Sequence, residues 1–335
     1  MRTSGIKGEM EASASTVSDF LLSQLAGKPK ELYQASAHNI KSGGKRLRPF
    51  MVIKSCELLG GSLSRALPAA AAIELVHNFT LVHDDIMDND DVRHNSPTVH
   101  KFYGLPLAIL AGDILFSKAF EILVIHGRKN GVAADRIGEM TSRLAVGCTE
   151  VCEGQATDVG LASQAKFPTE AEYISMIGKK TAALFDVACS LGALSSTSNL
   201  DQDVQNLSAF GRHIGIAFQL VDDLIGVVGD SKLTGKAAGN DIREGKKTFP
   251  IVLSLQKAKG DDKDKILKVL GSHSASPIEI NDAVRVVSDL GIEKKVREEA
   301  KKHMALALKC LGSYARSDAR DSLELSAEFV VGRSL

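Results

Sequence analysis

The fold class of this chain is decided by residues 67–91, LPAAAAIELVHNFTLVHDDIMDNDD. If this alanine-rich run is one helix, Asp84 and Asp88 project from the same face, about one turn apart. The run closes with a crowded set of carboxylates, Asp84, Asp85, Asp88, Asp90 and Asp91. Like charges at this spacing repel one another, so we expect a cation beside them. A solvated acidic helix end is the alternative interpretation.

A second acidic pair favours a functional interpretation of the first. Asp222 and Asp223 lie within AFQLVDDLIG, residues 217–226, where the pattern is apolar and helical. Unpaired carboxylates in such surroundings would be costly. A small number of oxygen ligands, with room for water and phosphate oxygens, suits Mg²⁺ better than Zn²⁺. The sequence therefore predicts that the two acidic clusters hold divalent cations.

Cationic segments elsewhere indicate what those ions would bind. Basic residues recur in GGKRLRP at residues 43–49, in the KKT run at 179–181, and in a loop at 229–247 that is rich in Gly, Asp and Lys. Arginine offers phosphate a rigid donor fork, and lysine offers a flexible point charge. Acidic and basic groups together predict a site for metal and diphosphate. The loop is expected to close over the bound phosphate as a lid.

The order of these motifs resembles that of the trans-isoprenyl diphosphate synthases, the head-to-tail prenyltransferases. The likeness runs from about Tyr33 to Thr248 and rests on GGKRLRP, DDIMD at 84–88, GQATD at 154–158, KKT, FQLVDD at 218–223 and the lysine-rich loop. The resemblance implies an all-α fold, a single large helical bundle of the isoprenoid synthase type with a central apolar cavity. It also implies Mg²⁺-assisted ionisation of an allylic diphosphate and condensation with isopentenyl diphosphate.

The resemblance also implies roles for individual residues. Metal ligands are expected at Asp84, Asp85, Asp88 and Asp222. Allylic diphosphate binding is expected at Arg93, Lys180, Thr181, Gln219, Lys236 and Lys246. Isopentenyl diphosphate binding is expected at Lys45, Arg48 and His77. Of these, Asp84, Asp88, Asp222, Lys180 and Lys236 are the expected catalytic set, while His83 is interpreted as structural and Gln155 and Asp158 as groups that orient the site.

Three positions depart from the family pattern. His94 stands where a second arginine is usual after Arg93, so one contact to isopentenyl diphosphate would depend on a group that titrates near neutrality. Asn95 replaces a common glycine, which alters the turn. Gly226 replaces the third aspartate of the second motif. Because the first aspartate of that motif is the expected ligand, none of these changes predicts inactivity.

Phe79 is the candidate determinant of product length. It lies five residues before Asp84, with the small Thr80 between them, a pattern that resembles geranylgeranyl diphosphate synthases. A core phenylalanine is the structural alternative. The predicted product is geranylgeranyl diphosphate, made from dimethylallyl, geranyl or farnesyl starters. Farnesyl diphosphate synthase and a non-catalytic regulatory subunit remain alternatives, whereas a terpene cyclase would have no use for GGKRLRP.

Composition agrees with a helical enzyme. The 335 residues are 44% apolar but only 5% aromatic, without tryptophan, which favours packed helices over a β-sandwich. A formal net charge of zero argues against nucleic acid as the main partner. Cysteines are odd in number and scattered, so free thiols are expected. No apolar run suits export or a membrane span, which predicts a cytoplasmic protein.

The chain reads as one domain, residues 15–335, behind a flexible tail, residues 1–14. Long helices are expected at 67–90, 106–126, 133–158, 169–194 and 202–228, followed by shorter helices towards the C-terminus. Gly43-Gly44 and Gly60-Gly61 are expected to end helices. The resemblance implies a homodimer, for which apolar helices such as 106–126 could supply an interface.

Overall fold

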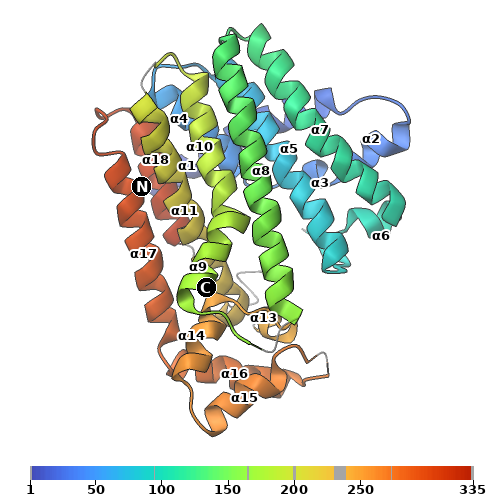
Figure 1. Cartoon of the computed structure of the whole chain (residues 1–335), viewed down its shortest axis with the longest axis vertical. Helices are drawn as coiled ribbons and strands as arrows, with labels where there is room; N and C mark the ends of the chain where they lie inside the picture. Colours follow the sequence, from blue (N-terminus) through green and yellow to red (C-terminus); the bar gives the residue numbers. More distant parts are fainter. Residues whose placement is uncertain are drawn as a thin grey trace. The chain divides into compact units, whose positions relative to one another are not determined.

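The structure is a computed structural model that describes residues 2–93, 95–163, 166–198, 201–229, 239–272 and 274–332. Within these ranges nearly all regular structure is helical (Figure 1). The exception is a short antiparallel ladder in which β1 (Val92–Arg93) pairs with β2 (Ser96–Pro97). The predicted all-α fold class is therefore confirmed.

The chain forms two compact units, and each is built from several segments. Unit 1 comprises residues 1–148, 184–211 and 313–325, and unit 2 comprises 149–183, 212–312 and 326–335. The prediction of one domain over residues 15–335 stays a prediction.

Unit 1 contains the N-terminal helices and parts of four later ones. Its helices are α1 (Arg2–Gln24), α2 (Lys30–Ser36), α3 (His38–Lys41), α4 (Leu47–Leu58), α5 (Leu63–Met87), α6 (Val99–Tyr103) and α7 (Leu105–Lys129), with parts of α8 (Ala134–Ser163), α10 (Ala183–Ser195), α11 (Asp201–Val228) and α18 (Asp318–Val331). Within this unit α5 packs along α7 and against α4.

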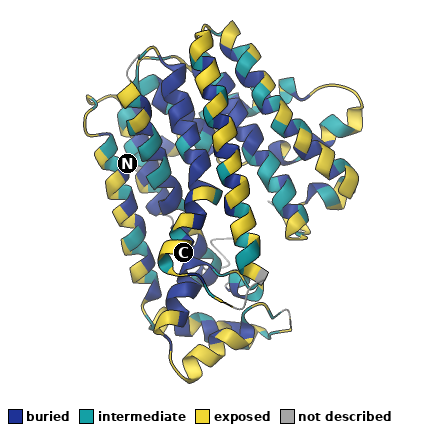
Figure 2. Cartoon of the chain, viewed as in Figure 1, coloured by how far each residue is buried: buried dark blue, intermediate teal, exposed yellow. Residues whose placement is uncertain are grey.

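The core of unit 1 follows from two helices that are apolar on every side. In α5 the run Ala69–Ala72 is fully buried, together with Ile73, Leu75 and Val76. α10 is buried almost throughout (Figure 2). A helix without a polar face has to be surrounded by other elements, because only burial removes its apolar surface from water.

Unit 2 contains the remaining helices. They are α9 (Glu170–Ile177), the π-helix η1 (Gly178–Ala182), α13 (Asn240–Arg243), α14 (Phe249–Lys257), α15 (Asp261–Val269), α16 (Pro277–Asp289) and α17 (Ile292–Cys310), with the rest of α8, α10, α11 and α18. Thr169 starts α9 through a capping box with Glu172, and Ser276 starts α16 in the same way with Glu279.

The N-terminal segment differs from its prediction. Residues 1–14 were expected to be a flexible tail, but α1 begins at Arg2, and Ile6 and Met10 are buried. Val17 and Leu21 continue the same apolar stripe. The low hydrophobicity of the segment hides this stripe, whose members recur only every four or seven residues, yet that spacing places them on one helix face.

The long central helices lie close to their predicted positions. α5, α7, α8 and α11 each begin and end within about five residues of the predicted bounds, which is common for helix ends that fray. The single helix predicted over 169–194 is instead α9, η1 and α10 in succession. All cysteines are free, as predicted. Among the described residues, no helix is long and apolar enough to cross a membrane.

Candidate active site

The first acidic motif closes α5 in unit 1. The backbone N–H of Asp88 donates to the carbonyl of Asp84 at 2.8 Å, so the helical turn continues as far as Asp88. The predicted geometry of Asp84 and Asp88, four positions apart on one helix face, is confirmed at the backbone. Asn89 then adopts a left-handed conformation, with φ 53°, and ends the helix.

Asp85 is oriented differently from its neighbour. Its side chain is 1% exposed, and Oδ1 accepts a hydrogen bond of 2.6 Å from Arg93 Nε. Burial raises the pKa of the Asp85 carboxyl, and the Arg93 guanidinium opposes that rise. Within the described part of the chain, no group donates a hydrogen bond to the buried Oδ2. Arg93, predicted to bind the allylic diphosphate, is therefore held by a carboxylate.

The segment after the motif turns back as a hairpin. β1 and β2 bracket residues 94 and 95, and Asn95 takes a left-handed φ of 61°. Asparagine tolerates this conformation, so the turn is preserved although glycine is absent. His94, the replacement for a second arginine, lies outside the described residues. Lys101 pairs with Asp91 at 2.9 Å, which supplies a further cation to the acidic cluster.

GGKRLRP contains one arginine with a structural role. Arg46 adopts a left-handed φ of 47°, and its guanidinium reaches Glu74 Oε1 at 2.6 Å and the Ile40 carbonyl at 2.7 Å. Asn78 also donates to the Glu74 carboxylate, at 2.9 Å. Burial raises the pKa of Glu74, and Arg46 opposes that shift. This buried pair fixes the segment that carries the predicted ligands Lys45 and Arg48.

The three residues predicted for isopentenyl diphosphate all belong to unit 1. Lys45 is exposed, whereas Arg48 and His77 are half-buried. The Arg48 guanidinium lies over the Phe185 ring, 4.3 Å from its centroid, a cation–π arrangement that fixes its direction. His77 lies on α5, seven residues before Asp84, so the two Cα atoms are about 10 Å apart along the helix axis.

The second acidic motif lies on α11 in unit 2, and its two aspartates differ sharply. Asp222 is exposed, whereas Asp223 is 3% exposed. Asp223 accepts hydrogen bonds from the Tyr173 hydroxyl at 2.5 Å and from Gln219 Nε2 at 2.7 Å. Burial raises the pKa of Asp223 to about 8, although both hydrogen bonds oppose the shift.

Tyr173 is a site residue that the sequence analysis missed. Its hydroxyl group is buried, and burial with the adjacent Asp223 raises its pKa well above the ordinary range. A tyrosine on an apolar helix carries no signal of its own, because the partner of its hydroxyl lies 50 positions away. Only the general rule that a buried hydroxyl group needs a partner could have drawn attention to it.

Two of the predicted diphosphate ligands meet on the same network. The Thr181 hydroxyl donates to Gln219 Oε1 at 2.8 Å, so KKT and FQLVDD are joined although they lie 38 positions apart. Thr181 belongs to η1, and π-helical turns are frequent at functional sites. Unit 2 therefore brings Thr181, Gln219 and Asp223 into one chain of hydrogen bonds.

Lys180 is anchored by the GQATD motif, as the orienting role proposed for Asp158 requires. Its ammonium group lies 2.5 Å from Asp158 Oδ2. The approach of α8 to η1 depends on Gly154, since a Cβ there would lie 2.7 Å from the Lys180 Cα and closer still to its nitrogen. The first residue of GQATD is thus a steric requirement, and the last one positions a cation.

The lysine-rich loop is described only in part. Lys236 lies outside the described residues, together with the rest of 230–238. Lys246 is exposed and pairs with Glu244 at 2.6 Å. Lys247 donates to the carbonyls of Leu161 and Lys166, at 2.7 and 3.1 Å. Burial lowers the pKa of Lys247. The proposed lid over residues 229–247 stays a prediction.

The donor set fits a hard divalent cation. Asp84, Asp88 and Asp222 offer only carboxylate oxygens, and the buried Asp85 Oδ2 receives no hydrogen bond from any described group. Within the described ranges, no three Asp, Glu, His or Cys side chains lie close enough together to enclose a metal. Mg²⁺ commonly binds through one or two carboxylates together with substrate phosphates and water, so a small carboxylate set fits that ion.

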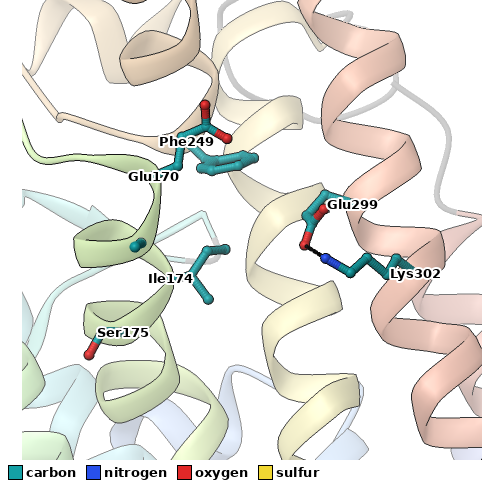
Figure 3. A pocket seen from close by; sticks show the side chains of 7 residues that line it. Glu170, Ile174, Ser175, Phe249, Glu299 and Lys302 are labelled. Atoms are coloured by element: carbon teal, nitrogen blue, oxygen red, sulfur yellow. Dashed lines mark hydrogen bonds and ion pairs between the residues drawn. The ribbon is translucent and has the colours of Figure 1, made fainter.

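Unit 2 also contains an open pocket of about 480 Å³ (Figure 3). Its apolar wall is formed by Ile174 and Phe249, and Glu299 pairs with Lys302 at its edge. The Phe249 ring stacks on Tyr173, with centroids 5.8 Å apart. None of the predicted site residues lines this pocket, so it is separate from the motifs described above.

Comparison with known proteins places these motifs in a family. The sequence model described as polyprenyl synthetase matches residues 29–287. The geranylgeranyl diphosphate synthase of Sulfolobus acidocaldarius is 42% identical over 320 residues, which cover 95% of this chain and 96% of that protein. The crystal structure of geranylgeranyl pyrophosphate synthetase from Pyrococcus horikoshii superposes with a TM-score of 0.92, at 36% identity and full coverage of both chains.

A further solved structure was determined with its ligands present. It is geranylgeranyl pyrophosphate synthase from Corynebacterium glutamicum, complexed with isoprenyl diphosphate and magnesium, with a TM-score of 0.82 and 29% identity over 97% of this chain and 98% of that one. The matched region contains every motif quoted above, in the same order. The chain therefore belongs to the polyprenyl synthetase family.

Proposed function

We propose that this protein condenses isopentenyl diphosphate with allylic diphosphates head to tail and releases geranylgeranyl diphosphate. The contact that carries the proposal is the hydrogen bond between Thr181 and Gln219, at 2.8 Å. It brings the lysine-bearing KKT motif onto the helix that presents Asp222. A cation and a carboxylate that are held on one scaffold suit a diphosphate and its metal ion. The names of the relatives support the product.

The carboxylates are proposed to prepare the leaving group. Asp84, Asp88 and Asp222 would hold Mg²⁺, which supplies positive charge to the diphosphate as its C–O bond breaks. Lys180 and Arg93 would bind the diphosphate oxygens directly. Each is held by a carboxylate, Lys180 by Asp158 and Arg93 by Asp85, so little reorganisation is needed when the substrate arrives.

The remaining diphosphate ligands would complete the allylic site. Thr181 and Gln219 offer a hydroxyl and an amide, and Lys246 and Lys236 would add charge from the loop. Water exclusion by that loop would protect the allylic carbocation. The carbocation is then attacked by the double bond of isopentenyl diphosphate, and loss of a proton restores a double bond in the lengthened chain.

Isopentenyl diphosphate is proposed to bind at Lys45, Arg48 and His77. Arg48 is best prepared for this role, because the Phe185 ring fixes its guanidinium plane. Lys45 is exposed and adds a mobile charge.

Product length is proposed to depend on Phe79. Its ring lies against α7 and contacts Phe116, with centroids 5.1 Å apart. Phe79 is five residues before Asp84, about 7–8 Å along α5 from the aspartate. A growing chain whose diphosphate is held at Asp84 would meet an aromatic barrier at that depth.

A homodimer in the cytoplasm completes the proposal. Large apolar side chains are exposed along α6 and the start of α7, namely Phe102 at 62%, Leu105 at 50%, Ile109 at 42% and Leu110 at 51%. An exposed apolar patch of this kind supports an interface between copies. Light scattering of the purified protein tests the dimer, and cell fractionation tests the location.

Product analysis tests the function. The purified protein is incubated with Mg²⁺, isopentenyl diphosphate and each of dimethylallyl, geranyl and farnesyl diphosphate, and the dephosphorylated products are sized. Geranylgeraniol from every starter is expected. Asp84→Asn should abolish turnover, whereas Asp91→Asn, a matched change in the same acidic cluster, should not. Farnesol as the end product would replace the proposed product, and no condensation by folded protein would indicate a regulatory subunit.

A further inference from the structure

His83 is packed into a space that exists only because residue 112 is glycine. Its imidazole lies on the α7 backbone, where Nε2 is 3.5 Å from the Ile109 carbonyl oxygen. A Cβ on Gly112 would lie 2.7 Å from the imidazole Cδ2 and closer still to Nε2. An alanine at this position therefore cannot coexist with the present ring position. Both residues belong to unit 1.

The same imidazole braces Phe79. His83 and Phe79 are four residues apart on α5, so they lie on one helix face. Their rings meet edge to face, with centroids 4.7 Å apart and planes at 65°. On its other side Phe79 contacts Phe116, which in turn contacts Phe120 at 5.2 Å. Phe79 is thus held between an aromatic row from α7 and a histidine from its own helix.

We propose that Gly112 and His83 form a positioning pair that sets product length through Phe79. Gly112 admits the imidazole against α7, the imidazole fixes the Phe79 ring, and that ring stops the growing chain. The inference rests on the proposed function, and it assigns a specificity role to a residue next to the first metal motif and to a glycine on the opposite helix. Without the imidazole, the Phe79 ring can turn aside and admit a longer product.

The size of the effect follows from the contact that is lost. An edge-to-face aromatic pair contributes about 0.5–1.5 kcal/mol, which corresponds to roughly a two- to twelvefold change in the partition between two products. The partition to be measured is the ratio of the C25 to the C20 prenyl alcohol, formed from farnesyl diphosphate and excess isopentenyl diphosphate. A residue that only supports folding would change total activity and stability but leave this ratio unchanged.

The experiment compares Gly112→Ala, His83→Ala, the double variant and a matched control. The control is Gly127→Ala, a glycine-to-alanine change in the same helix whose Cβ would meet only Ile137, at 3.4 Å. Both single variants should raise the C25:C20 ratio about two- to twelvefold. The double variant should match His83→Ala alone, because a methyl group at residue 112 has no effect once the imidazole is gone. Gly127→Ala should keep the wild-type ratio.

Four results would overturn the proposal. They are an unchanged ratio in His83→Ala, an effect of Gly112→Ala that persists in full without His83, an equal shift in Gly127→Ala, and a wild-type protein that makes no prenyl product. The last result would refute the proposed function as well, and the first three would refute only the positioning pair. If Gly112→Ala fails to fold, His83→Ala still decides, since it removes atoms and adds none.

Discussion

Gly154→Ala is the most direct test of how the fold positions a site lysine. The added methyl group would lie 2.7 Å from the Lys180 Cα, and ordinary carbon contacts are about 3.5–4 Å, so α8 and η1 must separate by about 1 Å. Overpacking of this kind costs about 1–3 kcal/mol. Backbone atoms form the obstacle, so no side-chain rotation relieves it. The same shift moves Lys180 relative to Asp158.

Gly160→Ala is the matched control, because it lies on the same helix and its Cβ would meet nothing within 4 Å. Alanine in a helix is favoured over glycine by about 1 kcal/mol, so this variant should be slightly more stable than wild type. Urea unfolding should separate the two variants by about 2–4 kcal/mol. A displacement of about 1 Å should also raise the KM for geranyl diphosphate about tenfold or more in Gly154→Ala. Equal stability and equal KM in both variants would refute the reasoning.

Three further predictions concern buried charges. Arg46→Ala should destabilise the fold by about 3–5 kcal/mol in urea unfolding, because it leaves the Glu74 carboxylate buried without its cation. The folded-state pKa of Asp223, about 8, exceeds the ordinary 3.8, so the folded protein keeps a proton that the unfolded chain releases, and stability should fall as pH rises from about 4 to 8. Asp223→Asn should remove this loss, and a variant with the wild-type pH slope would contradict the assignment. Asp84→Asn should reduce turnover while stability stays within about 0.5 kcal/mol, whereas Asp85→Asn should lower the unfolding free energy by about 1.5–3 kcal/mol; the reverse pattern would contradict the buried role of Asp85.

The helices were predictable where composition and periodicity agree. The alanine-rich run became α5, and the apolar pattern around Asp222 became α11. The failure at α1 has a physical cause, since Ile6, Met10, Val17 and Leu21 are buried by elements far away in the chain. A weakly hydrophobic stripe gains its stability from tertiary packing, and that packing is not written in the segment itself.

The site residues were predictable as types but not as partners. Motif order indicated Lys180, Thr181 and Gln219, yet the groups that hold them are set by contacts between distant helices. Asp158 lies 22 positions from Lys180, and Tyr173 lies 50 positions from Asp223. The break in the helix predicted over 169–194 is of the same kind, because the π-helical turn η1 lies where α8 approaches the backbone at Gly154.

The two aspartate doublets divide their roles in the same way. Consecutive residues on a helix point about 100° apart, so a doublet cannot direct both carboxylates at one ligand. Asp85 and Asp223 are 1% and 3% exposed and bind groups of the protein, Arg93 in one case and Tyr173 with Gln219 in the other. Asp222 is exposed and Asp84 is half-buried. This asymmetry favours Asp84 over Asp85 as a metal ligand and gives the second aspartate of each motif a separate purpose, which is to orient the neighbouring groups that would meet the diphosphate.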